Sequence, residues 1–530
     1  MCPRELAGEY KPLLYTTTAR NPERLKFFLV ILKEFEGQTL TDTLATQIMG
    51  RFIQFGLVQP MKRTDAIKAK WPRGEQATTL LTDKEVQWML ENNPQDHKEA
   101  GFSKGWPSRF DTYCKILKRL GLAYYEPNAS IFISALGNHL ADVLNLEIND
   151  DTISWRVEHP EYEQDVFLQA FAREQRSNPF VKELNDNIPL ILLLQTIQKI
   201  NADSELSGCG ISYKEIPLLL FWKDNNAEEL YQRIKQLRTE HGANPSAEVI
   251  EDICVNEILK SSFKKFKLHS IVQEYPDEFV RKMRMTGLIS FRGAGRYIDI
   301  NRNEQGKIDY ILANYASYQK YTSARDYFNY LSTIDTNLFS QTTVTATVTD
   351  KEQLLVKWTS EFSLQRVTDE LLVLCAKTHS QDQILKFLSA PVRLEFLTAL
   401  AIKLRFPNVH VLPNYRCDDE GLPTSTAGGN QADIECQEGN NGITVEVTMA
   451  EGRSQTVMEI WPIARHLTDY QKTYPNAQCV FVAPSIFADS QKQIDFVKFQ
   501  DHQVIRPYSI DAFVEFLKVG NQQLYVAEKE

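Results

Sequence analysis

Two acidic residues, Asp433 and Glu446, lie in neighbouring segments of alternating polar and apolar residues towards the C-terminus. Residues 432–436 alternate, and residues 443–449 alternate strictly, with Glu446 on the polar side. A period of two is typical of half-buried strands, and the turn-forming run 439–442 between the segments predicts a hairpin. The two carboxylates would then meet on one face of a sheet.

Paired carboxylates of this kind have a specific chemical use. They repel each other and stay ionised when a cation neutralises them. Oxygen ligands favour Mg2+, with Mn2+ able to substitute, over zinc. A metal held there would polarise a phosphate, lower the pKa of an attacking water and stabilise the leaving oxygen. The pair indicates phosphodiester hydrolysis; for the Glu446 strand alone, the alternative is the solvated side of an ordinary sheet.

The elements around the hairpin would bring three more polar residues to the same face. A serine and a proline at 389–391 indicate a helix start, which puts Glu395 near the beginning of that helix. After the hairpin, apolar residues at helical spacing predict a helix with Glu459 and His466 on one side, which Pro462 kinks or restarts. An apolar run follows and predicts a buried strand. These segments predict an α/β unit with acids at one edge.

These residues, with Gly429-Asn430-Gln431 before the aspartate and Val445–Thr448 around the glutamate, resemble the cleavage domain of the AlwI-like type IIS restriction endonucleases. That family includes site-specific nicking endonucleases. The resemblance implies a nuclease core of the PD-(D/E)xK kind. It implies a catalytic set of five residues: Glu395, Asp433, Glu446, Glu459 and His466. It further implies that the metal ligands are Asp433, Glu446, the Val447 carbonyl and, directly or through water, Glu395.

The sequence departs from the generic core at two positions. Thr448 stands where a lysine is usual, and Ala432 stands where a proline is usual. The first departure leaves two candidates for activating the water, His466 and a second metal ion.

Composition sets limits on the class of protein. The chain has 530 residues, of which 43% are hydrophobic and 24% charged, as in soluble globular proteins of three or four domains. Its eight cysteines form no CxxC pairs, so we expect reduced thiols and no zinc site. We find no membrane-spanning run and no signal peptide, and expect a bacterial-type cytoplasmic protein. Although the net charge is −10, residues 1–130 and 255–330 are mildly basic.

A helix followed by a glycine and a short hairpin occurs twice, about residues 108–133 and 277–300. Such a unit is typical of a winged helix, which presents a recognition helix and a wing to DNA; the alternative is a structural or protein-binding module. A basic loop at residues 62–73 is a further candidate for phosphate contact, or simply a solvated loop. The candidate DNA-binding residues are Lys62, Arg63, Lys70, Arg73, Arg109, Lys115, Lys118, Arg119, Arg281, Lys282, Arg284, Arg292 and Arg296.

The predicted fold is multidomain: a mainly α winged-helix recognition region followed by an α/β nuclease domain of the PD-(D/E)xK kind. The predicted parts are 1–150 and 151–305, one winged-helix subdomain each, a linker at 306–340, and the nuclease domain at 341–530. Residues 340–349, rich in serine and threonine, suit a flexible boundary.

We expect a type IIS-like endonuclease that binds a short asymmetric site in double-stranded DNA and cuts outside it. One metal centre cuts one strand, so cutting both strands would need a second cleavage domain, through dimerisation or a small catalytic subunit. The alternatives are a nicking enzyme, the large subunit of a heterodimeric restriction enzyme, and a DNA-binding protein that does not cleave.

Overall fold

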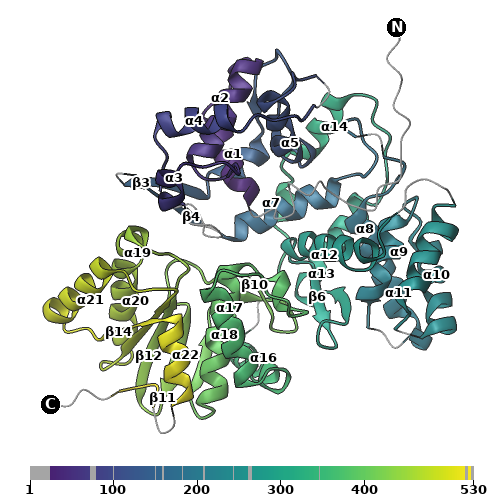
Figure 1. Cartoon of the computed structure of the whole chain (residues 1–530). Helices are drawn as coiled ribbons and strands as arrows, with labels where there is room; N and C mark the ends of the chain where they lie inside the picture. The colour runs from purple at the N-terminus through teal and green to yellow at the C-terminus, as the bar shows by residue number, and fades with distance from the viewer. Residues whose placement is uncertain are drawn as a thin grey trace. The chain divides into compact units, whose positions relative to one another are not determined.

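The computed structural model describes residues 24–71, 79–98, 101–149, 151–157, 160–181, 183–206, 209–242, 244–260, 266–344, 347–519 and 523–526. The chain forms two compact units, and the chain as a whole contains both helices and strands (Figure 1). Unit 1 comprises most of the chain up to Val344. Unit 2 is built mainly from Thr345–Glu530 and includes Leu146–Pro160. In the part of the chain that is described, no helix is long and apolar enough to cross a membrane.

The first half of unit 1 is a small helical bundle with a two-stranded hairpin. Its apolar helix faces are buried against one another, and Phe28 packs edge-on against Phe52 with ring centroids 4.8 Å apart. Its elements are α1 (Leu25–Lys33), α2 (Asp42–Gln54), α3 (Asp65–Lys70), α4 (Asp83–Asn92), α5 (Trp106–Arg119), β1 (Ala123–Tyr124), β2 (Phe132–Ile133) and α6 (Ala135–Ala141). Thr82 and Glu85 form a capping box at the start of α4.

The second half of unit 1 repeats the pattern of helices and hairpin around a three-stranded sheet of order β5-β7-β6. The helices α8 and α9 are strongly apolar and buried in the core. The elements are α8 (Pro189–Ala202), η3 (Ser204–Leu206), β5 (Ile211–Ser212), η4 (Tyr213–Glu215), α9 (Ile216–Phe221), α10 (Ala227–His241), α11 (Ala247–Asp252), η5 (Ile253–Ile258), η6 (Ser270–Glu274), α12 (Tyr275–Met285), β6 (Ile289–Arg292) and β7 (Tyr297–Ile300).

The two halves share their connection between helix and hairpin. Gly121 after α5 and Gly287 after α12 both have a positive φ, +73° and +74°, which glycine adopts without steric cost. The residue that closes each hairpin bonds back to that glycine: the Ser134 hydroxyl donates to the Gly121 carbonyl at 2.6 Å, and the Asn301 amide to the Gly287 carbonyl at 2.8 Å. The helix, glycine and hairpin predicted at both places are therefore present.

A third extended segment also joins each hairpin. In the first half, the segment 37–40 bonds to residues 128–131, with Ile131 N–H donating to the Gln38 carbonyl at 3.0 Å. In the second half, β5 pairs antiparallel with β7. Sequence analysis missed both segments because each is only a few residues long and shows no alternating run.

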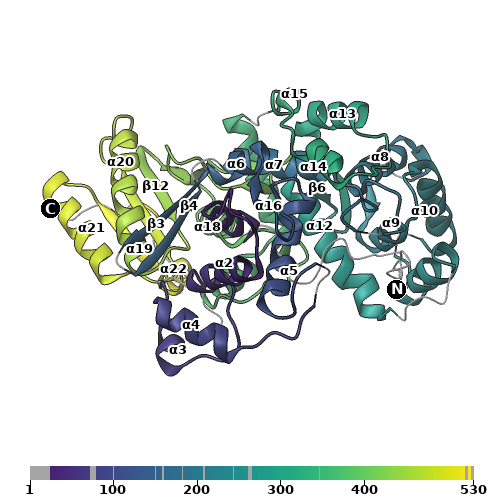
Figure 2. The ribbon, with the colours of Figure 1, turned by 90° about the horizontal axis from the view of Figure 1, so that it is seen from above.

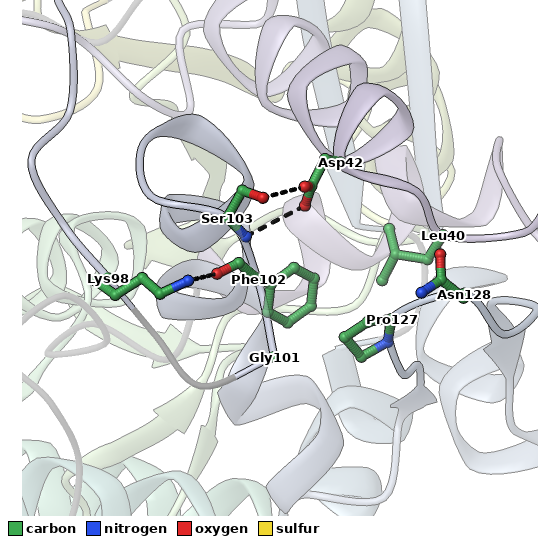
Figure 3. A pocket seen from close by; sticks show the side chains of 8 residues that line it. All are labelled: Leu40, Asp42, Lys98, Gly101, Phe102, Ser103, Pro127 and Asn128. Carbon is green, nitrogen blue, oxygen red and sulfur yellow. Dashed lines mark hydrogen bonds between the residues drawn. The ribbon is translucent and has the colours of Figure 1, made fainter.

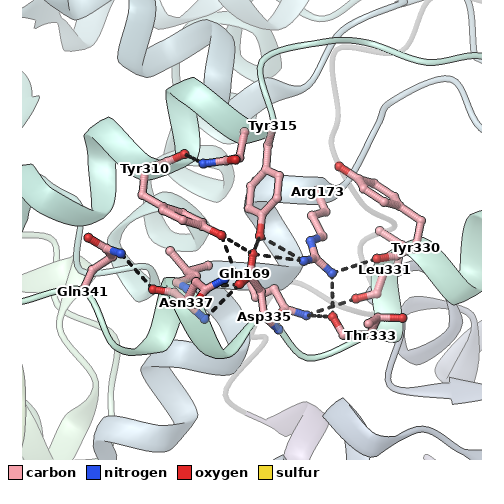
Figure 4. Close-up of polar contacts among 12 residues, drawn as sticks. Gln169, Arg173, Tyr310, Tyr315, Tyr330, Leu331, Thr333, Asp335, Asn337 and Gln341 are labelled. Carbon is pink, nitrogen blue, oxygen red and sulfur yellow. Dashed lines mark hydrogen bonds and ion pairs between the residues drawn. The ribbon is translucent and has the colours of Figure 1, made fainter.

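The segment predicted as a linker, 306–340, is folded into unit 1. It contains α13 (Gln305–Asn314), α14 (Ala324–Ser332) and α15 (Thr336–Phe339), which follow η7 (Arg302–Glu304) and lie with α7 (Pro160–Arg173). Figure 4 shows the polar network that joins them. The Asp335 carboxylate accepts hydrogen bonds from Tyr310 and Tyr315, and its backbone N–H donates to Gln169 on α7 at 2.8 Å. Buried tyrosine and aspartate partners hold this segment, so it is not a flexible connector.

Unit 2 contains a five-stranded mixed sheet of order β14-β13-β12-β11-β8. β12, β13 and β14 are parallel, and β11 is antiparallel to both β12 and β8. The strands are β8 (His410–Pro413), β11 (Ile434–Glu438), β12 (Asn441–Val447), β13 (Gln478–Ala483) and β14 (Ile505–Ser509), and a separate ladder joins β9 (Arg416–Cys417) to β10 (Pro423–Ser425). The predicted hairpin (β11 and β12) and the predicted buried strand (β13) are confirmed.

Helices cover both faces of this sheet (Figures 1 and 2). One layer contains α16 (Val348–Glu361), α17 (Leu364–Cys375), η8 (Leu385–Phe387), α18 (Ala390–Arg405) and α22 (Ile510–Lys518). The other contains α19 (Arg453–Met458), α20 (Ile460–Gln471) and α21 (Ala488–Asp501). Residues of α20 and α21 form one buried core with Cys479, Phe481 and Ala483 of β13. Unit 2 also includes the hairpin of β3 (Leu144–Asn149) and β4 (Thr152–Val157), whose second strand contacts α19.

Candidate active site

Asp433 and Glu446 lie opposite each other at one end of the β11–β12 hairpin. Ile434 pairs with Val445, so the antiparallel register sets the preceding residue, Asp433, against Glu446. The Val447 N–H donates to Asp433 Oδ2 at 2.8 Å, which fixes the orientation of that carboxylate. Alternation along β12 puts Ile443 and Val445 on the other face, so the sequence pattern that predicted this pair is the one that folds it.

His466 of α20 reaches the same face and contacts Glu446. Its Nδ1 lies 2.9 Å from Glu446 Oε1, and the side chains are only 6% and 8% exposed. Burial lowers the pKa of the His466 imidazole, which favours a neutral ring. Such a ring, protonated on Nδ1, donates to Glu446 and leaves Nε2 with a lone pair. This Nε2 is buried and has no hydrogen-bond partner within the described residues.

Glu395 comes from α18, on the other layer of helices, as the predicted helix start requires. Pro391 lies in the first turn of that helix. The side chain is 4% exposed, and its Oε2 accepts a hydrogen bond from the Ala427 N–H at 3.0 Å. Burial raises the pKa of Glu395 well above its usual value, and the neighbouring Asp433 carboxylate raises it further.

The electrostatics of the three acids favour a bound cation. Burial raises the pKa of Asp433 well above its usual value, and repulsion from Glu446 adds to it. The pKa of Glu446 is raised by burial and then by Glu459. A divalent cation would reverse both causes, because it replaces lost solvation and neutralises like charges. The cluster therefore has the charge, hardness and burial of a site for a divalent cation.

The residues that could hold a metal are not arranged as a complete ligand set in the structure. No group of three histidine, cysteine, aspartate or glutamate side chains stands in metal-binding positions, as far as the chain is described. Asp433 Oδ2 is engaged by the Val447 N–H and Glu446 Oε1 by His466. These two opposed carboxylates, with the oxygen of the adjacent Val447 carbonyl, are the donor set that fits a hard cation, and each carboxylate has a second oxygen.

Glu459 holds Thr448 and lies close enough to Asp433 and Glu446 to raise the pKa of both carboxyls. Thr448 Oγ1 donates to Glu459 Oε1 at 2.9 Å and accepts from the Ala450 N–H at 3.0 Å. The predicted single helix is two helices, since α19 ends at Met458 and α20 restarts at Ile460. The break at Glu459, with Pro462 in the first turn of α20, turns Glu459 towards Thr448 while His466 faces Glu446.

A pocket of about 540 Å³ adjoins these residues. His466, Asn430 and Gln431 line it, as does Tyr470, whose hydroxyl donates to the Cys436 carbonyl at 3.2 Å. Sequence analysis missed the tyrosines of this pocket. A signal for them existed at Gly442, where a Cβ would lie 2.7 Å from Tyr470 and Tyr474, so only glycine lets those rings cover the strand.

Three candidate DNA-binding residues are wrong, because the structure buries them inside unit 1. Arg119 pairs with Glu174 at 3.0 Å, Lys282 pairs with Glu278 at 2.5 Å, and Arg284 donates to the Ile289 carbonyl at 2.6 Å. The Arg119 side chain is 7% exposed, Arg284 is 4% exposed, and the Lys282 side chain is fully buried. Helical spacing could not separate them from surface residues, because both helices are covered on more than one side.

The other candidates have mixed surroundings. Lys62 and Arg296 are exposed, Arg109 and Arg281 are half-buried, and Arg73 lies outside the described residues. The rest make contacts within unit 1. Lys70 pairs with Glu85, Lys115 with Asp111 and Arg292 with Asp299, whereas Arg63 and Lys118 donate to backbone carbonyls of Trp71 and Tyr125.

Unit 1 contains a further pocket of about 370 Å³, beside the turn of the first hairpin (Figure 3). Its one lining carboxylate, Asp42, accepts hydrogen bonds from the backbone and side chain of Ser103. Lys98 donates to the Phe102 carbonyl. With its charged groups occupied in this way, the pocket has the features of a packing defect rather than of a reaction centre.

Comparisons with known proteins identify a family for this chain. The profile of the AlwI restriction endonuclease family matches residues 118–373 and 369–516, which is most of the chain. Among solved structures, the small subunit (R.BspD6I2) of the heterodimeric restriction endonuclease R.BspD6I is 24% identical, with 29% of this chain and 76% of that chain covered and a TM-score of 0.25.

Restriction endonuclease FokI bound to DNA is 12% identical, with 94% of this chain and 70% of that chain covered and a TM-score of 0.21. Scores this low do not establish a shared fold. No curated protein matches. The family match rests instead on sequence, and it spans both the repeated helix-and-hairpin region and the buried acids of unit 2. The chain therefore belongs to the AlwI restriction endonuclease family.

Proposed function

We propose that this protein is a type IIS-like restriction endonuclease that binds a short asymmetric site in duplex DNA and hydrolyses phosphodiester bonds outside it with Mg2+. The observation that carries the proposal is the opposed pair of carboxylates, Asp433, which is half-buried, and Glu446, which is buried, with His466 2.9 Å from Glu446. A buried acid with a raised pKa costs stability when it is ionised, and such residues cluster at functional sites. Membership of a restriction endonuclease family indicates that the function of this site is DNA cleavage.

In this proposal each residue of the site has one task. Asp433, Glu446 and the Val447 carbonyl would hold Mg2+, with Mn2+ as a substitute, and Glu395 would act through metal or water. The bound metal would stabilise charge on the phosphate and lower the pKa of water. The Val447 N–H holds Asp433 in place, and His466 holds Glu446.

His466 is the proposed base for the attacking water. A neutral ring bonded to Glu446 through Nδ1 would have Nε2 available to accept a proton. Thr448, at the position of the usual lysine, is bonded to Glu459 and has no basic group. Glu459 would therefore act by positioning Thr448 and the end of β12 rather than by touching substrate.

Recognition is assigned to the two repeats of unit 1, which we interpret as winged helices of a PD-(D/E)xK-type multidomain enzyme. Each repeat has the helix, the hairpin and the third extended segment of that fold. The residues proposed to contact DNA are those left at the surface, among them Lys62, Arg109, Arg281 and Arg296.

A second candidate function is site-specific nicking, alone or as the large subunit of a heterodimeric enzyme. The argument in its favour is that one centre, at the opposed carboxylates Asp433 and Glu446, would cut one strand. A third candidate, a DNA-binding protein without cleavage, is favoured by Thr448 in place of lysine.

The test is incubation of the purified protein with supercoiled plasmid in Mg2+, with Ca2+ as the control, followed by sequencing of the ends. Cuts at a fixed offset from one motif, in Mg2+ alone, support the proposal. Nicked and linear products distinguish one-strand from two-strand cutting. Asp433→Ala and Glu446→Ala should abolish cutting and retain site binding. Intact plasmid with retained duplex binding would contradict the nuclease proposal.

A further inference from the structure

Four charged side chains of unit 1 are buried close to one another and come from both of its repeats. Arg119 lies on α5 of the first repeat, Glu278 and Lys282 lie on α12 of the second, and Glu174 directly follows α7. Their exposed fractions are 6%, 6%, 0% and 2%. Arg119 pairs with Glu174 at 3.0 Å, and Lys282 pairs with Glu278 at 2.5 Å. These four residues form the buried ion cluster.

The two ion pairs of the cluster act on each other. Burial lowers the pKa of Lys282 to about 8; among its charged neighbours, Glu278 and then Glu174 raise that pKa, and Arg119 lowers it. Nearby charges shift a pKa in this way when they lie within a short distance of the group. Glu174 therefore faces a cation from each repeat: Arg119, with which it pairs, and Lys282, whose charge it helps to balance.

Glu174 lies at one end of α7, and the other end of that helix also contacts both halves of unit 1. The Glu163 carboxylate pairs with Lys26 of α1, in the first half, at 2.7 Å. Gln164 packs against Gly287, which follows α12 in the second half, because a Cβ on Gly287 would lie 2.5 Å from the Gln164 amide nitrogen. Ten residues of helix rise by about 15 Å. α7 is thus attached to both halves at two places about that far apart.

The cluster contributes direction more than stability. Burial deprives each charge of its hydration, and well-packed apolar residues in place of a buried ion pair often stabilise a protein as much or more. A guanidinium and a carboxylate, however, pair only within a narrow range of distances and orientations, whereas apolar side chains can shift against one another. The cluster therefore fixes the placement of α5 relative to α12 more tightly than apolar packing would.

The placement of α5 relative to α12 matters because these are the helices that we propose to enter the grooves of DNA. One turn of B-DNA, about 10 base pairs, rises by about 34–36 Å, so one base pair corresponds to about 3.4 Å and a rotation of about 35°. A small shift between the two helices would bring one of them opposite a different base pair. The distance between the helices thus sets the distance between the bases that each can read.

We infer that Glu174 is a positioning residue: by holding Arg119 of the first repeat beside Lys282 of the second, it sets the spacing between the two groups of base pairs that the repeats read. The inference rests on the proposed function, in which both repeats take part in recognition. Glu174 and Arg119 are buried and act through the helices, not by touching DNA. Their effect is on which spacing is accepted, and not on the strength of the phosphate contacts.

The test uses the full chain with Arg119→Met and Glu174→Leu combined. This double variant removes both members of an ion pair and leaves neither charge alone, and Lys282 keeps its partner Glu278. A second variant, Glu174→Asp, keeps the charge and shortens its reach. It serves if the double variant does not fold, and it should also accept an altered spacing better than the wild type does.

The matched control is Arg176→Met combined with Glu183→Leu. This ion pair is equally short, at 2.9 Å, and its side chains are 2% and 3% exposed. Both residues lie in the segment between α7 and α8, so their pair does not join the two repeats. The control therefore removes a buried ion pair of the same kind without touching the cluster.

The measurement is the selection of bound duplexes from a random-sequence library in Ca2+, followed by sequencing of the bound fraction. Affinities are then measured for the selected motif and for versions of it with one base pair inserted at each position. Both steps measure binding alone, so their result does not depend on whether the protein cuts DNA.

The wild type and the control should select two groups of base pairs at one spacing. They should bind about 100-fold or more weakly when a base pair is inserted between the groups, since several base contacts are then lost. The double variant should bind the uninterrupted motif within about threefold of the wild type and lose only about tenfold on insertion. A double variant that rejects the insertion as strongly as the wild type would overturn the inference. So would a wild-type motif that no insertion divides, because one repeat alone would then read bases.

The distance between the repeats gives a second readout that needs no DNA. Spin labels at Asn128 and Ala294, which are exposed in the turns of the two hairpins, should give one narrow distance distribution in the wild type and in the control. The double variant should give a broader one, and equal distributions would overturn the inference. If the library yields no motif at all, the proposed sequence-specific recognition fails, and the label distances show separately whether Glu174 holds the two repeats in place.

Discussion

Replacing Asp433 by asparagine should make the metal-free protein more stable while abolishing cleavage. Asparagine has nearly the shape of aspartate and keeps an oxygen to accept the Val447 N–H, which lies 2.8 Å from Asp433 Oδ2. What it removes is a buried negative charge opposite Glu446. The substitution therefore separates the electrostatic role of the residue from its packing.

The size of the gain in stability follows from the register in which β11 pairs with β12. Directly opposite residues on antiparallel strands have Cβ atoms about 5 Å apart, and two unit charges at that separation repel by about 3 kcal/mol at an effective dielectric constant of about 20. This is an upper value, because the raised pKa values of both acids let protonation relieve part of the repulsion. For a unit of this size, 1 kcal/mol corresponds to about 2–4 °C in Tm, so we expect a rise of several degrees, up to about 10 °C.

The assay is differential scanning calorimetry of the full chain, first with EDTA and then with excess Mg2+. The wild type should gain about 2.7 kcal/mol when Mg2+ is at a hundred times its Kd, whereas Asp433→Asn should gain little. The matched control is Glu435→Gln, two residues further along β11, where the Glu435 carboxylate accepts from Asn414 at 3.2 Å. It should keep the wild-type response to Mg2+. An Asp433→Asn protein that is less stable in EDTA, or that responds to Mg2+ and cuts like the wild type, refutes the reasoning.

Three other predictions concern the base, the fold and the DNA surface. His466→Gln should lower the single-turnover cleavage rate by about 10²–10⁴-fold without weakening duplex binding in Ca2+; an unchanged rate would leave a second metal as the activating group. Gly121→Ala should lower the stability of the protein by about 1–3 kcal/mol in urea unfolding, since a Cβ there would lie 2.7 Å from Leu331; Gly242→Ala, with φ +70° but nothing within 4 Å, should cost less. Arg296→Ala should weaken DNA binding at all sequences and reduce the slope of affinity against salt by about one ion, whereas Lys282→Met should leave both unchanged, because Lys282 is buried against Glu278.

The strands around the active site could be predicted from sequence because their pattern is local. Strict alternation from Ile443 to Met449 is set by one buried face, and it also fixes which acids share the other face. The pairing of Glu446 with His466 is less local: it depends on β13 lying beside β12 and on α20 packing against β13. Spacing along the predicted helix put Glu459 and His466 on one side. In the structure the helix restarts after Glu459, with His466 bonded to Glu446 and Glu459 bonded to Thr448.

The surface of unit 1 was predicted less well, because burial of a charged side chain depends on what packs around its helix. Lys282 lies off the apolar stripe of α12, as a DNA-contacting residue would. Its partner Glu278 lies one helical turn earlier, and nothing in the sequence of the two residues indicates that their ion pair is buried. Burial lowers the pKa of Lys282 to about 8, against the raising effect of Glu278, which is the mark of a core residue rather than of one that meets phosphate in water.

The absent lysine is the strongest sequence argument against catalysis, and the structure changes how it bears on the question. A threonine at 448 that pointed into an empty site would suggest a lost activity. Instead its hydroxyl links the Glu459 carboxylate to the Ala450 N–H, so it braces the end of β12 beside Glu446. The group that we propose for proton transfer is on α20, at His466 Nε2. If that is the base, Thr448→Lys should not restore or increase cleavage, and it should destabilise the protein by breaking the contact with Glu459. A Thr448→Lys enzyme that cuts faster than the wild type would show that the missing lysine limits catalysis.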